Sequence, residues 1–331
     1  MGRSSGLRWM VGAAAPLAAV LWLACGEDYM AAPLPDEPVF KDDEASAPKD
    51  SAPIELGDAG DASNAPDVLT FCDAATPFQT VAALAAVNTA LDDAFPTLTD
   101  DELILYFQRG DVGGASNPNF FVAQRATPTA DFGAPVQVSE LADGQNNSFP
   151  AVTGKGEALY FGSSSNIRVA KSVGVGRFGI AMDVPGLASP DVAERSPALF
   201  AGGDELWYSI TGDAGVIHFR RAALFADGGV GMPSSVPELE ATGYESGLAS
   251  TRDGLTIYFG SPRVGGQGGG DIWMANRASR SAPFANLATA TAVNSAFDEQ
   301  PGWLSVDACR LYFTTSRLGT FDIFVASRPK P

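Results

Sequence analysis

The sequence predicts an all-β protein, a five-bladed β-propeller, and the main observation is a repeated word. Leu-Tyr-Phe or a close variant occurs five times, with last residues Phe107, Phe161, Tyr208, Phe259 and Phe313. The words are about 50 residues apart, and each lies in a unit with four segments rich in strand-forming residues. A period of this length with four strands per unit is typical of propeller blades. A six-bladed ring is the alternative architecture.

The first two strands of each unit lie on either side of a tight turn. The segment before each word carries Pro or Gly near its start, and these segments begin at Phe95, Phe149, Ser196, Ser246 and Gln300. Asp and Gly residues lie between that segment and the word, as in TGKGE and TRDG. Such residues favour the turn of a β-hairpin, so we expect the segment and the word to pair.

A third and a fourth strand follow each word. The third strands are predicted to begin at Asn119, Asn166, Val216, Asp271 and Asp322. The fourth segments open at Phe132, Phe178, Phe225 and Phe284. The fifth unit stops after its third strand, but the segment from Thr76 aligns with the fourth segment from Ala282. We therefore expect an N-terminal fourth strand to close the ring, which leaves no open sheet edge.

The single histidine of the chain, His218, falls on a third strand. It aligns there with Phe121, Arg168, Trp273 and Phe324. With one histidine, the chain offers neither a multi-histidine zinc site nor a Ser-His-Asp triad with a special histidine. No catalytic residues and no resident metal are predicted.

One unit carries a recognisable signature. Leu248 to Trp273 follows the pattern S-x-D-G-x-x-I-Y-F-x-S-x-R-x-G-G-x-G-x-x-D-I-W closely, and Pro301 to Phe324 is the next best copy, whereas the unit at Ser196 lacks the Arg and the Asp. These units resemble the TolB-like, WD-repeat-like bacterial propeller repeat over nearly all of residues 76–328. The resemblance implies the fold and is weak for function, because such propellers serve as scaffolds, as binding modules and as domains attached to peptidases.

The N-terminal segment has the layout of a secretory signal, predicted over residues 1–24. Arg3 and Arg8 precede an apolar run of 14 residues, Met10 to Leu23, which is too short for a spanning helix. The end of this run, LWLACG, resembles a bacterial lipoprotein signal, in which the cysteine, here Cys25, is acylated. Gly26 after it points by the same resemblance to the outer membrane. An ordinary signal peptide with an incidental cysteine is the alternative.

Two charged regions follow. Residues 25–70 are predicted to be a disordered tether, because Gly26 to Thr70 carries 12 acidic residues against two lysines and little apolar surface. Residues 71–331 form the predicted propeller and carry 27 acidic and 17 basic residues, which argues against nucleic acid as a partner.

Cysteine usage fits an exported protein. If Cys25 is lipidated, Cys72 and Cys309 are left as a pair at the predicted closure of the ring. A disulfide there closes a long loop and is worth about 4 to 5 kcal/mol in the chain-entropy picture. Two unrelated buried thiols are the alternative.

Polar residues recur where each fourth strand leads into the next first strand, and we expect these loops to surround the mouth of the central channel. The candidate ligand-binding residues are Asp93, Asn147, Glu194, Glu245 and Glu299. In a binding interpretation they hold a peptide, a glycan, an envelope protein or a cation such as calcium; in a catalytic one, two act as acid and base, as in five-bladed glycosidases. Equivalent positions favour binding, and capping of backbone amides is the structural alternative.

The run GGQGGG, residues 265–270, invites comparison with a phosphate loop. Asp271 and the apolar IWMA follow it, instead of the Lys, the Ser or Thr and the helix start that such a loop needs. We expect it to join the second and third strands of the fourth unit. Arg263 and Asp271 are expected to tie the two ends of this loop together.

Overall fold

The computed structural model describes residues 71–110, 117–187, 192–200, 202–212, 216–241 and 244–330. The chain divides into two units, Met1–Ala65 and Pro66–Pro331, and all described residues belong to the second. The predicted signal segment, Cys25 and the tether therefore lie outside the described residues.

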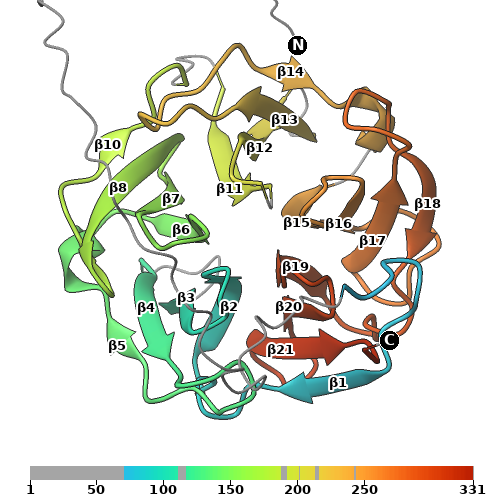
Figure 1. Cartoon of the computed structure of the whole chain (residues 1–331), viewed down its shortest axis with the longest axis horizontal. Helices are drawn as coiled ribbons and strands as arrows, with labels where there is room; N and C mark the ends of the chain where they lie inside the picture. Colours follow the sequence, from blue (N-terminus) through green and yellow to red (C-terminus); the bar gives the residue numbers. More distant parts are fainter. Residues whose placement is uncertain are drawn as a thin grey trace, which may run out of the picture. The chain divides into compact units, whose positions relative to one another are not determined.

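The described residues form five small antiparallel sheets around a common axis (Figure 1). We number the blades 1 to 5 and give the strands of each from the innermost to the outermost. Blade 1 consists of β2 (Asp92–Leu98), β3 (Ile104–Gly110), β4 (Asn119–Gln124) and β5 (Val136–Gln137). Blade 2 consists of β6 (Asn147–Val152), β7 (Ala158–Ser163), β8 (Asn166–Gly174) and β10 (Met182–Asp183). Blade 3 consists of β11 (Glu194–Leu199), β12 (Glu205–Thr211), β13 (Ile217–Ala223) and β14 (Ser234–Ser235). Blade 4 consists of β15 (Ser246–Ser250), β16 (Thr256–Ser261), β17 (Asp271–Asn276) and β18 (Ala285–Thr289). Blade 5 consists of β19 (Glu299–Leu304), β20 (Arg310–Thr315), β21 (Asp322–Ser327) and β1 (Thr80–Ala83). The predicted five-bladed propeller is confirmed, and its closing strand is β1.

The repeated word is buried because it forms the second strand of each blade, which lies between two neighbouring blades. In blade 2, Leu159 and Phe161 pack against blade 1, whereas Tyr160, between them, packs against blade 3. Side chains alternate between the two faces of a strand, so a strand covered on both faces is apolar throughout. The core is accordingly five clusters, one at each junction of two blades.

The first strands bend at the Pro or Gly of their opening segments. Each pairing with the second strand is irregular there, between Ala94 and Thr97 in blade 1 and at the equivalent places in the other blades. Proline cannot donate to a β-ladder and is confined to bulges and edges, which accounts for this irregularity. The residue at the bend has positive φ at Phe95, Phe149 and Ser196, with values of 55°, 54° and 48°.

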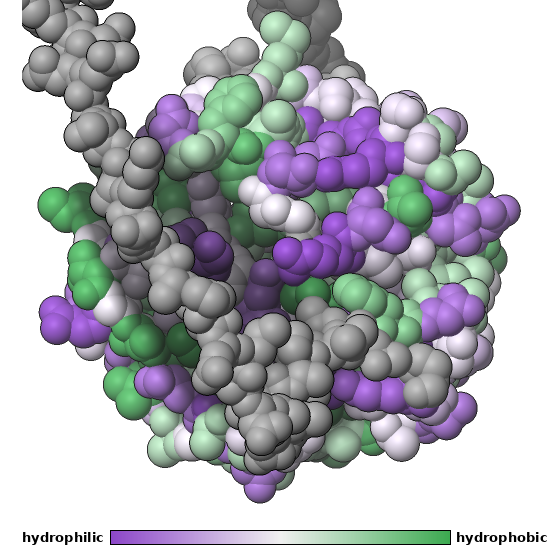
Figure 2. Space-filling view, in the orientation of Figure 1, coloured by the Kyte–Doolittle hydropathy of each residue, from purple (hydrophilic) through white to green (hydrophobic). Residues whose placement is uncertain are grey.

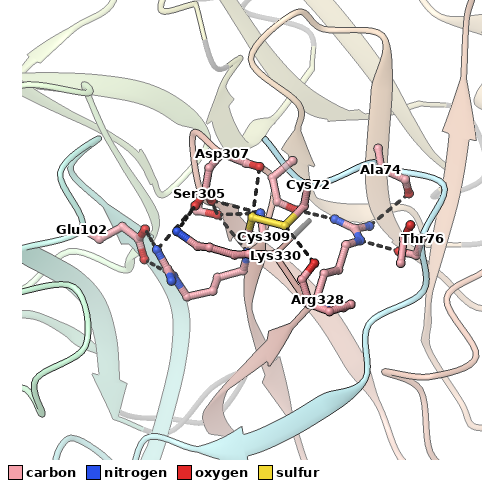
Figure 3. Close-up of a disulfide and its surroundings, with 12 residues drawn as sticks. Cys72, Ala74, Thr76, Glu102, Ser305, Asp307, Cys309, Arg328 and Lys330 are labelled. Atoms are coloured by element: carbon pink, nitrogen blue, oxygen red, sulfur yellow. Dashed lines mark hydrogen bonds and ion pairs between the residues drawn. A yellow bond between two sulfur atoms is a disulfide. The ribbon is translucent and has the colours of Figure 1, made fainter. Parts of the chain in front are cut away.

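Closure of the ring is covalent as well as hydrogen-bonded. β1 pairs antiparallel with β21, with Thr80 opposite Ser327. Cys72 and Cys309 form the expected disulfide, with their Cα atoms 5.1 Å apart (Figure 3). Beside it, Arg328 donates to the carbonyl oxygens of Thr76 and Ala74, at 2.5 and 3.1 Å. The N-terminal strand is thus fixed to the last blade by three kinds of contact.

Two details of the sequence alignment were wrong. Phe225 does not open a fourth strand: it is exposed at a turn closed by Gly229, and the fourth strand of blade 3 begins at Ser234. The alignment of His218 with Trp273 is also wrong, by two residues. Trp273 pairs with Phe259, the last residue of the repeated word in blade 4, and the residue that pairs with the equivalent Tyr208 in blade 3 is Arg220. Blade 3 departs most from the repeat, so its alignment had the fewest fixed points.

Among the described residues, blade 2 has the most exposed large apolar side chains, and Val136 of blade 1 is also exposed. Figure 2 shows hydrophobic residues gathered at the edge of the ring where β5, β8 and β10 lie. The exposed residues of these elements and their connections include Val136, Val173, Ile180 and Met182. The outermost strands there, β5 and β10, have only two residues each, which leaves little edge for pairing with another chain.

Candidate functional site

The five predicted ligand-binding residues lie at the start of the first strands, but their side chains are buried. Their exposed fractions range from 0% to 4%, and none of them lines the central cavity described below. The expectation that they surround the mouth of the channel is therefore corrected. They lie deeper, where each first strand meets the loop that precedes it.

Asp93 shows what such a residue does in blade 1. Its Oδ1 accepts a hydrogen bond from Arg109 Nε at 2.6 Å, and its Oδ2 accepts from the amide and the hydroxyl of Thr89 at 2.7 and 2.9 Å. Arg109 also donates to the carbonyl oxygen of Val87 at 2.6 Å. Its guanidinium lies 4.5 Å from the centre of the Phe121 ring. The carboxylate, the arginine, the loop carbonyl and the aromatic ring form a unit that we call the arginine clamp.

Blade 5 repeats the arginine clamp with the same geometry. Arg317 donates to Glu299 Oε1 at 3.0 Å and to the carbonyl oxygen of Val293 at 2.7 Å, and stacks on Phe324. The amide and hydroxyl of Ser295 donate to the same carboxylate, as Thr89 does in blade 1. The residue that begins the first strand is therefore tied to the loop that arrives from the preceding blade.

Blade 4 has the clamp with one donor missing. Arg263 donates to Glu245 Oε1 at 3.0 Å and to the carbonyl oxygen of Leu239 at 2.8 Å. Ala241 occupies the place of Thr89 and Ser295 and has no hydroxyl, and Glu245 Oε2 is buried without a hydrogen-bond partner among the described residues. Burial, only partly opposed by Arg263 and Ser261, raises the pKa of Glu245.

These contacts decide what the clamp carboxylates can do chemically. In blades 1 and 5 both oxygens of the carboxylate already accept arginine, hydroxyl or amide donors, which leaves no room for a ligand. Removal of one partner of a buried ion pair costs about 3 to 5 kcal/mol. The geometry supports the structural interpretation, in which these groups satisfy loop amides.

Blades 2 and 3 have different arrangements at the same place. In blade 2, Asn147 donates to the carbonyl oxygen of Leu141 and to Asp143, both at 2.9 Å, and so makes the loop contact that the arginine makes elsewhere. In blade 3, Glu194 lies beside Tyr208, whose pKa is raised to about 12 by burial and by the negative charge of Glu194. Neither blade has an arginine at the end of the second strand, as blade 1 does, or just after it, as blades 4 and 5 do.

In the glycine run GGQGGG, side-chain carboxylates accept the hydrogen bonds of the loop amides that a phosphate would otherwise accept. Asp271 accepts hydrogen bonds from the amides of Gln267 and Gly268 at 3.0 to 3.1 Å, and Asp298 accepts from the amide of Gly270 at 2.7 Å. Asp271 therefore caps the loop as expected, but Arg263 pairs with Glu245 rather than serving the loop. Acidic side chains already occupy the amides that an anion would need.

A cavity of about 350 Å³ lies on the axis of the ring and is the better candidate site. All five first strands line it, through the bends at Phe95, Phe149, Ser196, Gly247 and Pro301. The rings of Phe95 and Phe149 stack within it, with their centres 3.9 Å apart. The half-buried Trp303 also lines the cavity. A concave site that combines aromatic surface with polar groups is suited to binding a ligand.

Charged groups reach this cavity only from the turns between first and second strands. They are Asp100, Lys155, Glu157 and Arg252. Arg252 Nη1 lies 3.5 Å from Asp100 Oδ2, and these residues come from blades 4 and 1, which are not neighbours. The ion pair therefore crosses the mouth of the cavity, at the opposite end of the first strands from Asp93 and Glu299.

Sequence reasoning missed this site, although a signal for it exists. The recurring Pro or Gly in each first strand marks the bends that line the cavity, and the charged turns follow each bend by a few residues. Within the described ranges, no three His, Cys, Asp or Glu side chains come together as a metal site. No helix in the described part of the chain has the length and apolar character needed to cross a membrane.

Comparison with known proteins adds evidence on the fold. No protein-family model matches the chain, and neither does any curated protein. The endo-arabinase from Bacteroides thetaiotaomicron VPI-5482 is 12% identical over 72% of this chain and 95% of its own, with a TM-score of 0.52. The GH43_1 enzyme from Xanthomonas citri is 17% identical over 75% and 89%, also with a TM-score of 0.52.

TolB from Acinetobacter baumannii is 14% identical over 72% of this chain, with a TM-score of 0.43. The match spans 55% of that protein, so this chain corresponds to about half of its length. The two structures with TM-scores of 0.52 are similar to this chain in architecture alone, and they agree with its all-β, five-bladed β-propeller fold.

Proposed function

We propose that this chain is an exported, lipid-anchored propeller that binds a ligand in its central cavity without transforming it. The ligand is a peptide or glycan segment of the cell envelope, either free or as part of an envelope protein. The observation that carries the proposal is the difference between the carboxylates of the repeat and the groups that line the cavity. Those of the repeat are buried in structural contacts, whereas the cavity offers aromatic rings and a half-exposed ion pair at its mouth.

The mouth is suited to opening when a ligand arrives. Asp100 and Arg252 are each about half exposed, and an ion pair of that kind contributes at most about 1 kcal/mol. Its two charges can turn to a ligand at little cost. Below them, the stacked rings of Phe95 and Phe149 offer the flat apolar surface on which sugar rings and peptide side chains pack.

Glycoside hydrolysis is the second candidate, because two carboxylates, Asp100 and Glu157, line the same cavity. A glycosidase needs one carboxylic acid and one carboxylate on either side of the scissile bond. The two solved structures with TM-scores of 0.52 are an endo-arabinase and a GH43_1 enzyme, which gives the class of substrate to test. Asp100 is engaged by Arg252, which favours binding over catalysis.

One experiment separates the two candidates. The purified propeller is incubated with arabino- and xylo-oligosaccharides while new reducing ends are measured, and binding of the same sugars and of a peptidoglycan fragment is followed by calorimetry. We expect saturable binding of at least one probe with no new reducing ends. Turnover by the wild type that Asp100→Asn or Glu157→Gln abolishes would establish the enzyme instead.

Phe149→Gly tests whether the ligand binds in the central cavity. The substitution removes one ring of the stacked pair at a position with a φ of 54°, which glycine adopts readily. We expect at least about tenfold weaker binding at nearly unchanged stability, since aromatic contacts of this kind are worth about 1 kcal/mol or more. Unchanged binding would exclude the central cavity as the site.

Anchoring is proposed from the sequence around Cys25, with the outer membrane as the destination. In a bacterial host with lipoprotein processing, the full chain should incorporate labelled fatty acid and fractionate with membranes, whereas Cys25→Ala should be secreted or periplasmic and unlabelled. Labelling of the variant, or a soluble wild type, would favour the ordinary signal peptide.

A further inference from the structure

Four loops at one end of blades 4, 5 and 1 each carry an exposed, large apolar side chain. The loops are residues 262–270, 294–298, 316–321 and 88–92, and the side chains are, in the same order, Val264, Phe297, Leu318 and Leu91. Phe297 is 49% exposed and the other three are more exposed. We call these four side chains the apolar ridge. The ridge lies on the three blades that have the arginine clamp, which are neighbours in the ring (Figure 1).

Hydrogen bonds join the four loops in series. The amide of Gly270 donates to Asp298 Oδ1 at 2.7 Å, which joins the first loop to the second. The amide of Ser316 donates to the carbonyl oxygen of Asp298 at 3.1 Å, which joins the second loop to the third. The amide of Phe321 donates to Asp92 Oδ1 at 3.0 Å, which joins the third loop to the fourth. The loops of the ridge therefore form one continuous surface across three blades.

The arginine clamp fixes the two ridge residues that precede first strands. The amide of Leu91 donates to the hydroxyl of Thr89 at 3.2 Å, and that hydroxyl donates to the carboxylate of its clamp. The amide of Phe297 donates in the same way to the hydroxyl of Ser295 at 3.3 Å, which donates to the carboxylate of the next clamp. One hydroxyl therefore connects each exposed residue to a buried carboxylate.

The other two ridge residues directly follow clamp arginines. The arginine amide before Val264 donates to the hydroxyl of Ser261 at 3.2 Å, and the one before Leu318 donates to that of Thr315 at 3.4 Å. Both hydroxyls donate to clamp carboxylates. Apolar side chains held on fixed loops lose little freedom when a partner covers them. A continuous exposed apolar surface of this kind marks an interaction site.

The charge around the ridge selects the kind of partner. Arg263 and Arg317 are the basic residues of the four loops, and both are paired with buried carboxylates. Asp298, half-buried beside Phe297, has no basic partner among the described residues. Residues 71–331 carry a net charge of 17 − 27 = −10. Such a surface attracts a basic partner and repels an anionic membrane, a second copy of this chain and the acidic segment 26–70.

We propose that the apolar ridge is the docking surface for a partner protein, through a segment whose apolar side chains are flanked by lysine or arginine. The apolar side chains of that segment pack on the ridge, and a basic one pairs with Asp298. The described chain begins at the opposite end of the blades, where Cys72 is bonded to Cys309 in the turn after β19. No residue of the ridge lines the central cavity, so this site is independent of the proposed function.

The probe is a fluorescently labelled amphipathic peptide of leucine and lysine, and the comparison is the same peptide with glutamate in place of every lysine. Fluorescence anisotropy is measured with the full chain carrying Cys25→Ala, so that no lipid is attached. We expect saturable binding of the lysine peptide and at least about tenfold weaker binding of the glutamate peptide. Equal affinities, or no saturable binding of the lysine peptide at about millimolar concentration, would overturn the proposal.

Matched variants locate the binding. Phe297→Ser with Leu318→Ser should weaken binding of the lysine peptide at least about tenfold, which is less than the full burial of two large apolar side chains provides. Ile180→Ser with Met182→Ser, at exposed apolar positions of blade 2, is the control and should leave binding unchanged. Asp298→Asn keeps the acceptor of the Gly270 amide but removes a charge, so binding should weaken by about threefold and depend less on salt.

The remaining outcomes also decide the question. Equal weakening by the control pair would show a general attraction to the acidic surface and overturn the docking site. If the double variant does not fold, Val264→Ser replaces a fully exposed side chain and should weaken binding by about threefold; unchanged binding would overturn the proposal.

Two further measurements test the other occupants of the ridge. Binding of the same protein to phosphatidylglycerol vesicles, if Phe297→Ser with Leu318→Ser abolishes it, would assign the ridge to a membrane and overturn the proposal. Self-association in analytical ultracentrifugation that the same substitutions abolish would assign it to a second copy of the chain. We expect neither. Sugar and peptidoglycan binding in the central cavity is measured separately, so either proposal can fail without the other.

Discussion

Blades 1, 4 and 5 differ from blades 2 and 3 in how each first strand is tied to the blade before it. In the first group an arginine, from the end of the second strand in blade 1 and from the loop after it in blades 4 and 5, joins a buried carboxylate to a loop carbonyl. In blade 2 an asparagine makes the loop contact directly, and in blade 3 a glycine, Gly212, stands at the sequence position of Arg263 and Arg317. The propeller therefore keeps its geometry with or without the arginine.

The same division appears at the other end of the blades. Arg125, Arg277 and Arg328 follow the third strands of blades 1, 4 and 5, and each stacks on the Phe of its fourth segment. In addition, Arg125 and Arg328 contact a tyrosine of the preceding blade. Blades 2 and 3 have Ser172 and Leu224 at this place. Blades 1 and 5 thus carry an arginine contact to the preceding blade at both ends of the junction, whereas the hydrogen bonds of Arg277 stay within blade 4.

The largest predicted effect on stability is that of removing the disulfide, which joins the N-terminal segment to blade 5. Cys72→Ala with Cys309→Ala should lower the free energy of unfolding by about 4 to 5 kcal/mol, because the bridge spans 237 positions and long loops lose the most entropy. Urea denaturation measures the change. Hydrogen exchange should locate the new opening at β1 and β21; faster exchange confined to blades 2 and 3 would contradict the closure argument.

Breaking one clamp tests the comparison itself. Arg317→Ala leaves the fully buried Glu299 without its cation and should cost about 3 to 5 kcal/mol. Arg220→Ala in blade 3, whose Nη1 lies 3.9 Å from the half-exposed Glu240, should cost no more than about 1 kcal/mol. Equal losses in urea denaturation would show that the clamps do not distinguish the two groups of blades.

Completing the clamp of blade 4 should stabilise the protein. Ala241→Ser places a hydroxyl where that of Thr89 donates to Asp93 Oδ2, the oxygen that does not pair with the arginine, so that the buried Oε2 of Glu245 gains a donor. We expect a gain of about 1 kcal/mol in the free energy of unfolding. Ala142→Ser, on an exposed position after a 3-10 turn of blade 2, is the control and should change stability by less than about 0.5 kcal/mol.

The pH dependence gives the smallest effect and has a definite sign. Because the folded protein raises the pKa of Glu245 above its usual 4.5, protonated Glu245 favours the folded state. Its contribution is complete below pH 4.5 and is lost as the pH rises through the folded pKa. As the pH rises from 4.5 through the folded pKa, the free energy of unfolding of the wild type should therefore fall relative to that of Glu245→Gln. In Ala241→Ser this fall should be smaller. A shift in the opposite direction would contradict the raised pKa.

The candidate sites show the limit of sequence alignment. Asp93, Glu245 and Glu299 were correctly seen to be equivalent, since their spacing from the repeated word is regular. Their partners were not foreseen, because Arg109 and Arg317 lie far along the chain from Val87 and Val293 and meet them only when the blades pack. A polar residue that recurs in a repeat can serve the packing of the repeat as easily as a ligand.

By itself the sequence determined the number of blades, the four strands of most of them, the closing strand and the cysteine pair. All of these follow from local patterns, namely alternation, turn residues and period, which each blade expresses on its own. Only the tertiary structure decided which polar groups are buried and which face a cavity. That depends on how the chain packs in three dimensions. Arg263 reaches Glu245 instead of Asp271, and the carboxylates that begin the first strands are buried, whereas Asp100 and Glu157 line the central cavity.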